Sequence, residues 1–262
     1  MVSEKSRERY SYSKLSSFHT CPLGYYYTYI EHKKGVGNCF SSYGGFLHSL
    51  MERCAKDELS LWDLAATYEN EFNEAVPEEF PTMKFKPTMD LKSKYYEEGL
   101  NYCSSFKGFY DCKILEVEGR FNTKIDDWDF TGIIDLLYYD KNGKLVIQDY
   151  KTKGSFKNKT EKAEYFRQLY LYCIHIKEKY GRFPDTLKLE MIRQKGAETA
   201  DKPYKPIEIP FQREGFVEAI HWARDTVKAI RDCWSYYPNV EEFHCNHICN
   251  HREYCPYRID EK

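Results

Sequence analysis

The stretch Thr131–Lys151 reads T-G-I-I-D-L-L-Y-Y-D-K-N-G-K-L-V-I-Q-D-Y-K and decides the expected fold. Two apolar runs in it are joined by Asn142-Gly143, a dipeptide that accepts the positive backbone angles of a tight type I′ turn. We therefore expect a β-hairpin here. Residues 112–125, just before it, alternate between polar and apolar side chains, so these segments together predict an antiparallel meander.

Charged residues fall at defined places in this hairpin. Asp135 interrupts the first strand among isoleucines and leucines, where an unpaired carboxylate is costly to bury. Asp149 and Lys151 end the second strand and share one face of it, because they are two residues apart. The two carboxylates and the Tyr150 carbonyl oxygen suit Mg²⁺, and Lys151 could orient water and offset charge at a phosphodiester. Taken alone, the same charges also fit an ordinary solvated hairpin.

Further helices and strands are expected on both sides of the meander. Residues 1–12 are polar and expected to be frayed. A helix over 164–180 followed by a strand predicts a parallel crossover back to the sheet. A short helix capped by Ser13 or Ser16 is expected to end near Cys21-Pro22, and a second helix to run through Tyr25 to Tyr29. The remaining expected elements are helices over 61–75, 90–106 and 214–236, a helix begun by Ser41 or Ser42, and strands at 187–192 and 207–211.

Composition limits the class of protein. Of the 262 residues, 42% are hydrophobic and 31% charged, with a formal net charge of −2. We expect a single domain, with a mainly helical part over 1–110, a sheet and helix over 111–210, and a C-terminal helix and cysteine group over 211–262. The sequence has neither an apolar run of membrane-spanning length nor an N-terminal secretory segment, so an intracellular, cytoplasmic protein without a membrane partner is expected. A nucleic-acid surface would have to be local.

Four polar residues elsewhere belong near the hairpin in the expected fold. His48 flanks the apolar face of a helix, and Glu118 lies one strand before the hairpin. Gln168 and Tyr172 are four residues apart and therefore share a helix face. Each also has an ordinary structural interpretation, as a satisfied core histidine, a solvated carboxylate or polar groups bordering the core.

Ten cysteines are many for a protein of a reducing compartment, where clustered cysteines indicate metal before disulfides. Cys245, Cys249 and Cys255 form a dense group, and Cys21 is a distant fourth. Thiolates suit an iron–sulfur cluster or Zn²⁺, and three nearby histidines keep zinc open. Because such a group joins the two ends of the chain, its metal is expected to stabilise the fold.

Several short motifs follow one another in a defined order. They are Cys21-Pro22, Gly44-x3-His48, Glu118-x2-Phe121, Gly132-x2-Asp135, Asp149-Tyr150-Lys151, Gln168-x3-Tyr172 and the three terminal cysteines. This ordered set resembles the RecB-like branch of the PD-(D/E)XK nuclease superfamily. It looks most like the iron–sulfur members, such as AddB nuclease domains and CRISPR-associated single-strand exonucleases.

The resemblance implies a restriction-endonuclease-like α/β (α+β) core, a mixed central sheet flanked by helices, with the chain ends joined at a cysteine-ligated cluster. It implies that Mg²⁺ or Mn²⁺ is bound by His48, Asp135 and Asp149, and less regularly by Glu118, while Lys151 assists catalysis. In the family, the helix that here carries Gln168 and Tyr172 lies against the active site near the substrate strand.

The resemblance also favours a 4Fe–4S cluster bound by Cys21, Cys245, Cys249 and Cys255, with structural Zn²⁺ as the alternative. One departure concerns spacing, since three residues separate Cys245 from Cys249 where the family usually has two.

The sequence therefore predicts a metal-dependent nuclease that hydrolyses phosphodiester bonds, expected to be an exonuclease on single-stranded DNA ends. DNA repair or recombination, phage DNA metabolism and CRISPR adaptation are all compatible settings. The alternative is a nucleic-acid-binding or assembly subunit of a helicase–nuclease or adaptation complex with little activity of its own. The chain has no P-loop motif, so a helicase or CRISPR-adaptation protein would be a separate partner.

Overall fold

The computed structural model describes residues 8–82, 87–193 and 205–259. Its centre is a mixed six-stranded sheet with the order β1-β3-β4-β5-β6, and β2 pairs with β3. The strands are β1 Arg9–Ser11, β2 Lys113–Ile125, β3 Trp128–Tyr139, β4 Leu145–Lys151, β5 Thr186–Met191 and β6 Ile207–Pro210. The antiparallel β2-β3-β4 meander and the parallel β4–β5 pair confirm the predicted topology of this region.

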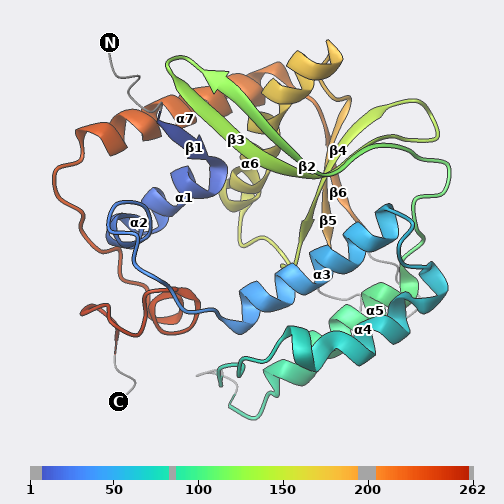
Figure 1. Cartoon of the computed structure of the whole chain (residues 1–262), viewed down its shortest axis with the longest axis horizontal. Helices are drawn as coiled ribbons and strands as arrows, with labels where there is room; N and C mark the ends of the chain where they lie inside the picture. Colours follow the sequence, from blue (N-terminus) through green and yellow to red (C-terminus); the bar gives the residue numbers. More distant parts are fainter. Residues whose placement is uncertain (1–7, 83–86, 194–204, 260–262) are drawn as a thin grey trace, which may run out of the picture.

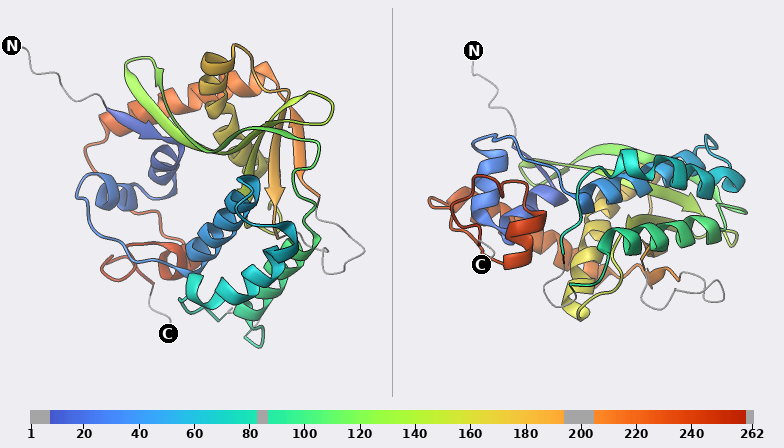
Figure 2. Two further views of the ribbon diagram at one scale, coloured as in Figure 1. Left: turned by 45° about the vertical axis from the view of Figure 1, so that its right-hand side comes forward. Right: turned by 90° about the horizontal axis from the view of Figure 1, so that it is seen from below.

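Helices flank the sheet on both faces (Figure 1). They are α1 Tyr12–Thr20, α2 Pro22–Tyr29, α3 Cys39–Ala55, α4 Leu61–Ala75, α5 Leu91–Ser105, α6 Lys159–Tyr180, α7 Arg213–Asp232 and the short π-helix η1 His244–Ile248. In Figure 2, α4 and α5 lie side by side on the outer side of α3. None of the helices in the described ranges is long and apolar enough to cross a bilayer.

Two apolar clusters fix the sheet from its two sides. The larger one packs α6 and α7 against one face, with Phe130 and Leu169 among its buried members. The second joins α3, α4 and α5 to the other face through Tyr150 and Ile192. Because burial of each large apolar side chain contributes about 1.5–3 kcal/mol, strand β4 between these clusters is firmly held.

Several expectations about local structure are wrong. Helix α6 begins at Lys159, five residues before the expected start at residue 164, because Asn158 caps it there. Residues 9–11 are not frayed: they form β1, parallel to β3, and Tyr10 is buried. The turn at Asn142-Gly143 is not type I′, because only Gly143 has a positive φ and the loop spans residues 140–144 between the paired Tyr139 and Leu145. Helix α7 ends at Asp232, four residues earlier than expected. The single-domain organisation stays a prediction.

Along one edge of β3, the sheet divides, because two different strands pair with the two ends of β3. Strand β2 pairs with nearly the whole length of β3 on one edge. On the other edge, β1 pairs with Asp129–Thr131 and β4 pairs with Leu136–Tyr139. The residues between them, 132–135, therefore form no ladder pair with either strand. The Asp135 carboxylate lies at this division and accepts a hydrogen bond from the Tyr150 backbone N–H of β4 at 2.9 Å.

Candidate functional site

Three side chains from different elements meet beside the division of the sheet. His48 comes from the middle of α3, Glu118 from β2 and Asp135 from β3. One ligand atom from each lies within 4.8 Å of the other two. An imidazole nitrogen and two carboxylate oxygens so close together form a donor set that fits Mn²⁺ or Mg²⁺.

In both β2 and β3, the regular alternation of side chains between the two faces of the sheet is interrupted at this point. Glu118 has a φ of 50°, in the left-handed region that non-glycine residues rarely adopt. Val117 packs with the cluster on the α3 side, whereas Phe121, four residues on, packs toward α6. Ile134 and Leu136, two residues apart on β3, also belong to opposite clusters. The break in alternation thus falls at Glu118 and at the neighbouring Asp135, and a strained backbone of this kind typically costs about 1–3 kcal/mol.

The His48 ring bridges the two hairpin strands. Its Nε2 lies 3.0 Å from the Tyr150 carbonyl oxygen, and its Nδ1 lies 3.4 Å from Asp135 Oδ2. Since a carbonyl can only accept, Nε2 carries the proton in this contact, and a neutral ring presents the Nδ1 lone pair toward Asp135. The Tyr150 carbonyl, predicted as a metal ligand, is therefore engaged by His48 here.

Asp149 and Lys151 belong to a second, adjoining chain of contacts. Asp149 is 3% exposed, and its Oδ2 forms an ion pair with Lys151 Nζ at 2.5 Å. Lys151 also donates to Gln168 Oε1 at 3.1 Å, and Gln168 Nε2 donates to the Tyr172 hydroxyl at 3.1 Å. The side-chain amide of Gln168 therefore fixes the position of the ammonium group. Asp149 contacts Lys151 rather than joining the His48 group.

Burial changes the protonation of the three grouped side chains. Burial, followed by the nearby Asp149 carboxylate, raises the pKa of Asp135 well above its ordinary value, against the opposing hydrogen bond from Tyr150. Burial also raises the pKa of Glu118 and lowers the pKa of His48. Crowded carboxylates removed from water are stabilised in their charged form by a cation, so the electrostatics as well as the donor atoms fit a divalent metal.

Two hollows open on either side of Glu118. One is lined on the α3 side by Gly44, Gly45, His48, Ser49, Glu52 and Glu118. The other, of about 460 Å³, is lined by Ser11, Ser13, Glu118, Arg120, Thr131, Gly132, Ile133, Asp135, Gln168 and Tyr172. The sequence interpretation did not include Ser13 or Arg120. The sequence feature that could have identified Arg120 as a site residue is its position two residues after Glu118 on an expected strand.

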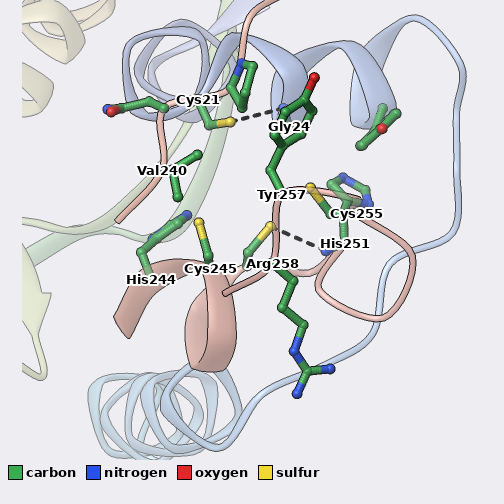
Figure 3. A pocket seen from close by; sticks show the side chains of 13 residues that line it. Cys21, Gly24, Val240, His244, Cys245, His251, Cys255, Tyr257 and Arg258 are labelled. Carbon is green, nitrogen blue, oxygen red and sulfur yellow. Dashed lines mark hydrogen bonds between the residues drawn. The ribbon is translucent and has the colours of Figure 1, made fainter. Parts of the chain in front are cut away.

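The four predicted cysteines line a separate pocket, where the first helices meet the C-terminal segment (Figure 3). All four thiols are free and half-buried. The Gly24 N–H donates to Cys21 Sγ and the His251 N–H donates to Cys249 Sγ, each at 3.4 Å. Burial raises the pKa of Cys249, and the thiols of Cys255, Cys21 and Cys245 raise it further. The pocket therefore brings together thiols from both ends of the chain.

The extra residue between Cys245 and Cys249 lies in a π-helical turn. The Cys249 N–H donates to the His244 carbonyl, five residues earlier, at 2.7 Å. A π turn contains one more residue than an α turn and is often found at functional sites. The longer spacing is thus accommodated locally, within η1.

The two histidines that line this pocket have different surroundings. The His251 ring is engaged through both nitrogens, with the Thr28 hydroxyl at 2.7 Å from Nε2 and the Tyr254 hydroxyl at Nδ1. His244 is half-buried beside the cysteines (Figure 3), and burial lowers its pKa. Among the described residues, the His244 ring nitrogens make no hydrogen bond, so His244 could bind a metal without first breaking one.

Comparison with known proteins covers nearly the whole chain. The family model described as "PD-(D/E)XK nuclease superfamily" matches residues 9–256. A solved structure titled "Crystal structure of SSO0001" aligns with 83% of this chain and 97% of its own, at 18% sequence identity and a TM-score of 0.36. No curated protein matches the sequence. The range matched by the family model contains the His48 group, Asp149, Lys151 and all four cysteines.

Proposed function

The chain belongs to the PD-(D/E)XK nuclease superfamily, and we propose that it is a Mg²⁺- or Mn²⁺-dependent deoxyribonuclease acting on the ends of single-stranded DNA. The observation that carries the proposal is the meeting of His48, Glu118 and Asp135 within 4.8 Å, beside the Asp149–Lys151 ion pair. Metal-dependent phosphodiester hydrolysis uses such metal-binding oxygens, and a nearby cation can offset the charge that develops on the phosphate.

His48, Glu118, Asp135 and Asp149 would hold the metal, which when bound supplies Lewis-acid stabilisation of the phosphate and a more acidic water. Lys151 orients the attacking water and offsets negative charge that develops on the phosphate. Gln168 holds the Lys151 ammonium group through its carbonyl oxygen, and Tyr172 fixes the orientation of the Gln168 amide. These contacts pre-position the ammonium group before substrate arrives.

The proposal is tested with single-stranded DNA labelled at either end, in Mg²⁺ or Mn²⁺, and with a circular single strand. We expect the wild type to degrade the linear strands and leave the circle intact, and Asp149→Asn to degrade neither. Cutting of the circle would replace the exonuclease assignment by an endonuclease. Equal degradation by both proteins would assign the activity to a contaminant and favour the alternative, a DNA-binding or assembly subunit.

A second part of the proposal concerns the cysteines, for which we infer a structural 4Fe–4S cluster bound by Cys21, Cys245, Cys249 and Cys255. All four cysteines line one pocket, and thiolates suit either an iron–sulfur cluster or Zn²⁺. The order of the motifs along the chain favours the cluster. The backbone N–H groups that donate to Cys21 and Cys249 are the kind of contact that tunes iron–sulfur clusters.

The metal is identified by purifying the protein without oxygen. A 4Fe–4S cluster gives visible absorption with iron and sulfide in equal amounts, whereas a colourless protein with one equivalent of zinc would establish the alternative. A helicase or CRISPR-adaptation partner remains a prediction, which co-purification from the native host would test.

A further inference from the structure

The strand register places a polar surface next to the candidate metal site. Side chains of β1, β3 and β2 that lie opposite one another form rows across the sheet. Counting toward the metal site, the rows are Arg9–Asp129–Lys124, then Ser11–Thr131–Asn122, then Ile133–Arg120, and finally Asp135 and Glu118. We call these rows, without the last, the strand-face rows.

This surface is open to solvent, whereas the opposite face of the same strands is buried. Arg120, Asn122 and Lys124 of β2 are exposed, and the alternate residues Phe121, Thr123 and Ile125 are buried. Phe121 and Ile125 pack in the cluster under α6. The alternation therefore leaves one hydrophilic sheet face beside the acidic site. Packing of the core does not by itself require polar side chains at this place.

The cations of this surface are available for an anion. Within the described parts of the chain, the side chains of Arg120 and Lys124 make neither an ion pair nor a hydrogen bond. Arg120 lines the same hollow as Asp135, Glu118 and Gln168. Two residues along a strand separate Arg120 from Glu118, a rise of about 6.6 Å. A positive charge one short step from the metal-binding carboxylates suits a phosphate next to the reacting one.

We propose that Arg120 binds a backbone phosphate of the nucleic-acid strand and that the strand-face rows guide this strand to the metal site. The inference rests on the proposed nuclease function and adds a positioning residue to it. Asn122 and Ser11 supply neutral polar groups of the kind that contact sugars and phosphates without reading sequence. Arginine suits the role because its planar fork can bind phosphate oxygens through two hydrogen bonds.

The lysine-rich loop that follows β4 is a poorer candidate for the same role. Lys151 is paired with Asp149, and Lys153 forms an ion pair with Glu161 at 2.9 Å. Releasing either lysine for a phosphate would first break an existing contact. Among the described residues, Arg120 has no ion pair or hydrogen bond to break, only the attraction of its charge to the nearby Glu118 carboxylate, so its net gain on binding a phosphate is larger.

The test measures binding and cutting separately. Binding of a fluorescent single-stranded oligonucleotide is measured by anisotropy at several salt concentrations, in an Asp149→Asn background that prevents hydrolysis. Arg120→Ala, Arg120→Lys and Arg213→Ala are compared, the last removing an exposed arginine at the start of α7. Initial rates of the same three substitutions in the otherwise unchanged protein give KM and kcat.

We expect Arg120→Ala to raise Kd and KM about tenfold or more, as for the loss of one charge-assisted hydrogen bond. The slope of log K against log salt should become shallower by about 0.7, as for one lost phosphate contact on a single strand. Arg120→Lys should keep the slope, and Arg213→Ala should match the wild type. kcat at saturating DNA should change little.

Each other outcome has a definite meaning. A wild type that binds and cuts DNA, with Arg120→Ala indistinguishable from Arg213→Ala in Kd and salt slope, overturns the inference and leaves the proposed function standing. If the protein binds DNA through Arg120 but does not cut it, the nuclease assignment is wrong and the proposed binding surface is supported. A wild type that binds no single-stranded DNA rejects the inference.

Discussion

The candidate metal site and the cysteine pocket both join distant parts of the chain, but they are built differently. The metal site is built on α3, β2, β3 and β4. Residues 145–150 of β4 are all buried, and apolar clusters pack on both faces of the sheet. The cysteines lie in short helices and loops and are all half-buried. The first region is shaped by the core before any metal binds, whereas none of the four pocket cysteines belongs to an apolar cluster of the described residues.

This difference separates the consequences of metal loss. A site preorganised by the core loses chemistry when a ligand is removed, because its geometry is maintained by other residues. If the cysteines bind the proposed structural metal, removing one of them should cost folding free energy, because metal binding then contributes to folding. Substitutions in the two regions should therefore affect different measurements.

The largest expected effect is on activity in the metal site. Asp149→Asn keeps the size of the side chain and removes the charge that pairs with Lys151. We expect DNA degradation to fall by roughly a thousandfold, with a melting temperature within a few degrees of the wild type. Asp127→Asn, which changes an exposed carboxylate, is the control and should keep full activity. Retention of most activity by Asp149→Asn would remove this residue from the metal site.

The next effect is on stability in the cysteine pocket. Cys255→Ala should lose the metal and several kcal/mol of folding free energy. Since each kcal/mol shifts the melting temperature of a domain of this size by about 2–4 °C, a fall of roughly 10 °C is expected. Cys233→Ala removes a half-buried cysteine outside the pocket and should retain the metal. Unchanged metal content and melting temperature in Cys255→Ala would mean that the cysteines do not bind a structural metal.

The parts of the fold that could be predicted were those with strong local patterns. The spacing of apolar residues along the sequence identifies strands β3 and β4 and the amphipathic helices. The meander and the crossover were therefore predicted correctly. Strand β1 was missed because three residues of ordinary polar sequence, R-Y-S, form a strand only through pairing with β3. Tertiary contacts there override local propensity.

The geometry of the site was less predictable than its residue types. His48, Glu118 and Asp135 were identified from motifs, but the left-handed conformation of Glu118 has no sequence signal, since glutamate rarely adopts it. The π turn between Cys245 and Cys249 was likewise visible only as an unexplained extra residue. Both features depend on how neighbouring elements pack, which a local pattern does not encode.

A smaller effect should follow from loosening Lys151 without changing any proposed metal ligand. Gln168→Ala removes the acceptor that holds the ammonium group at 3.1 Å. We expect kcat to fall about ten- to a hundredfold with little change in KM, because misplacement of a catalytic group by about 1 Å costs up to that much. Gln212→Ala, at the exposed cap of α7, is the control. A change in KM alone would show that Gln168 contacts the DNA instead of positioning Lys151.

The smallest effect compares the same steric change in the two regions. A Cβ at Gly132 would lie 2.7 Å from a ring carbon of Phe121, and a Cβ at Gly35 would lie 2.7 Å from Asn250 Cβ. Phe121 is buried in the core under the sheet, so Gly132→Ala should cost about 1–3 kcal/mol through overpacking. Gly35 and Asn250 are both exposed, and one backbone hydrogen bond, from the Val36 N–H to the Asn250 carbonyl oxygen at 2.8 Å, joins their loops.

Gly35→Ala should therefore cost about 0.5–1.5 kcal/mol, the strain or loss of that one surface hydrogen bond, and calorimetric melting of both variants measures the difference. Gly132→Ala should also slow DNA degradation, because its Cβ would lie 2.8 Å from a ring carbon of Tyr172, the hydroxyl partner of Gln168. Equal melting temperatures for the two variants would contradict the distinction between a core-held site and a cysteine pocket held by its metal. A larger loss for Gly35→Ala would reverse it, since the chain ends would then be the more tightly packed region.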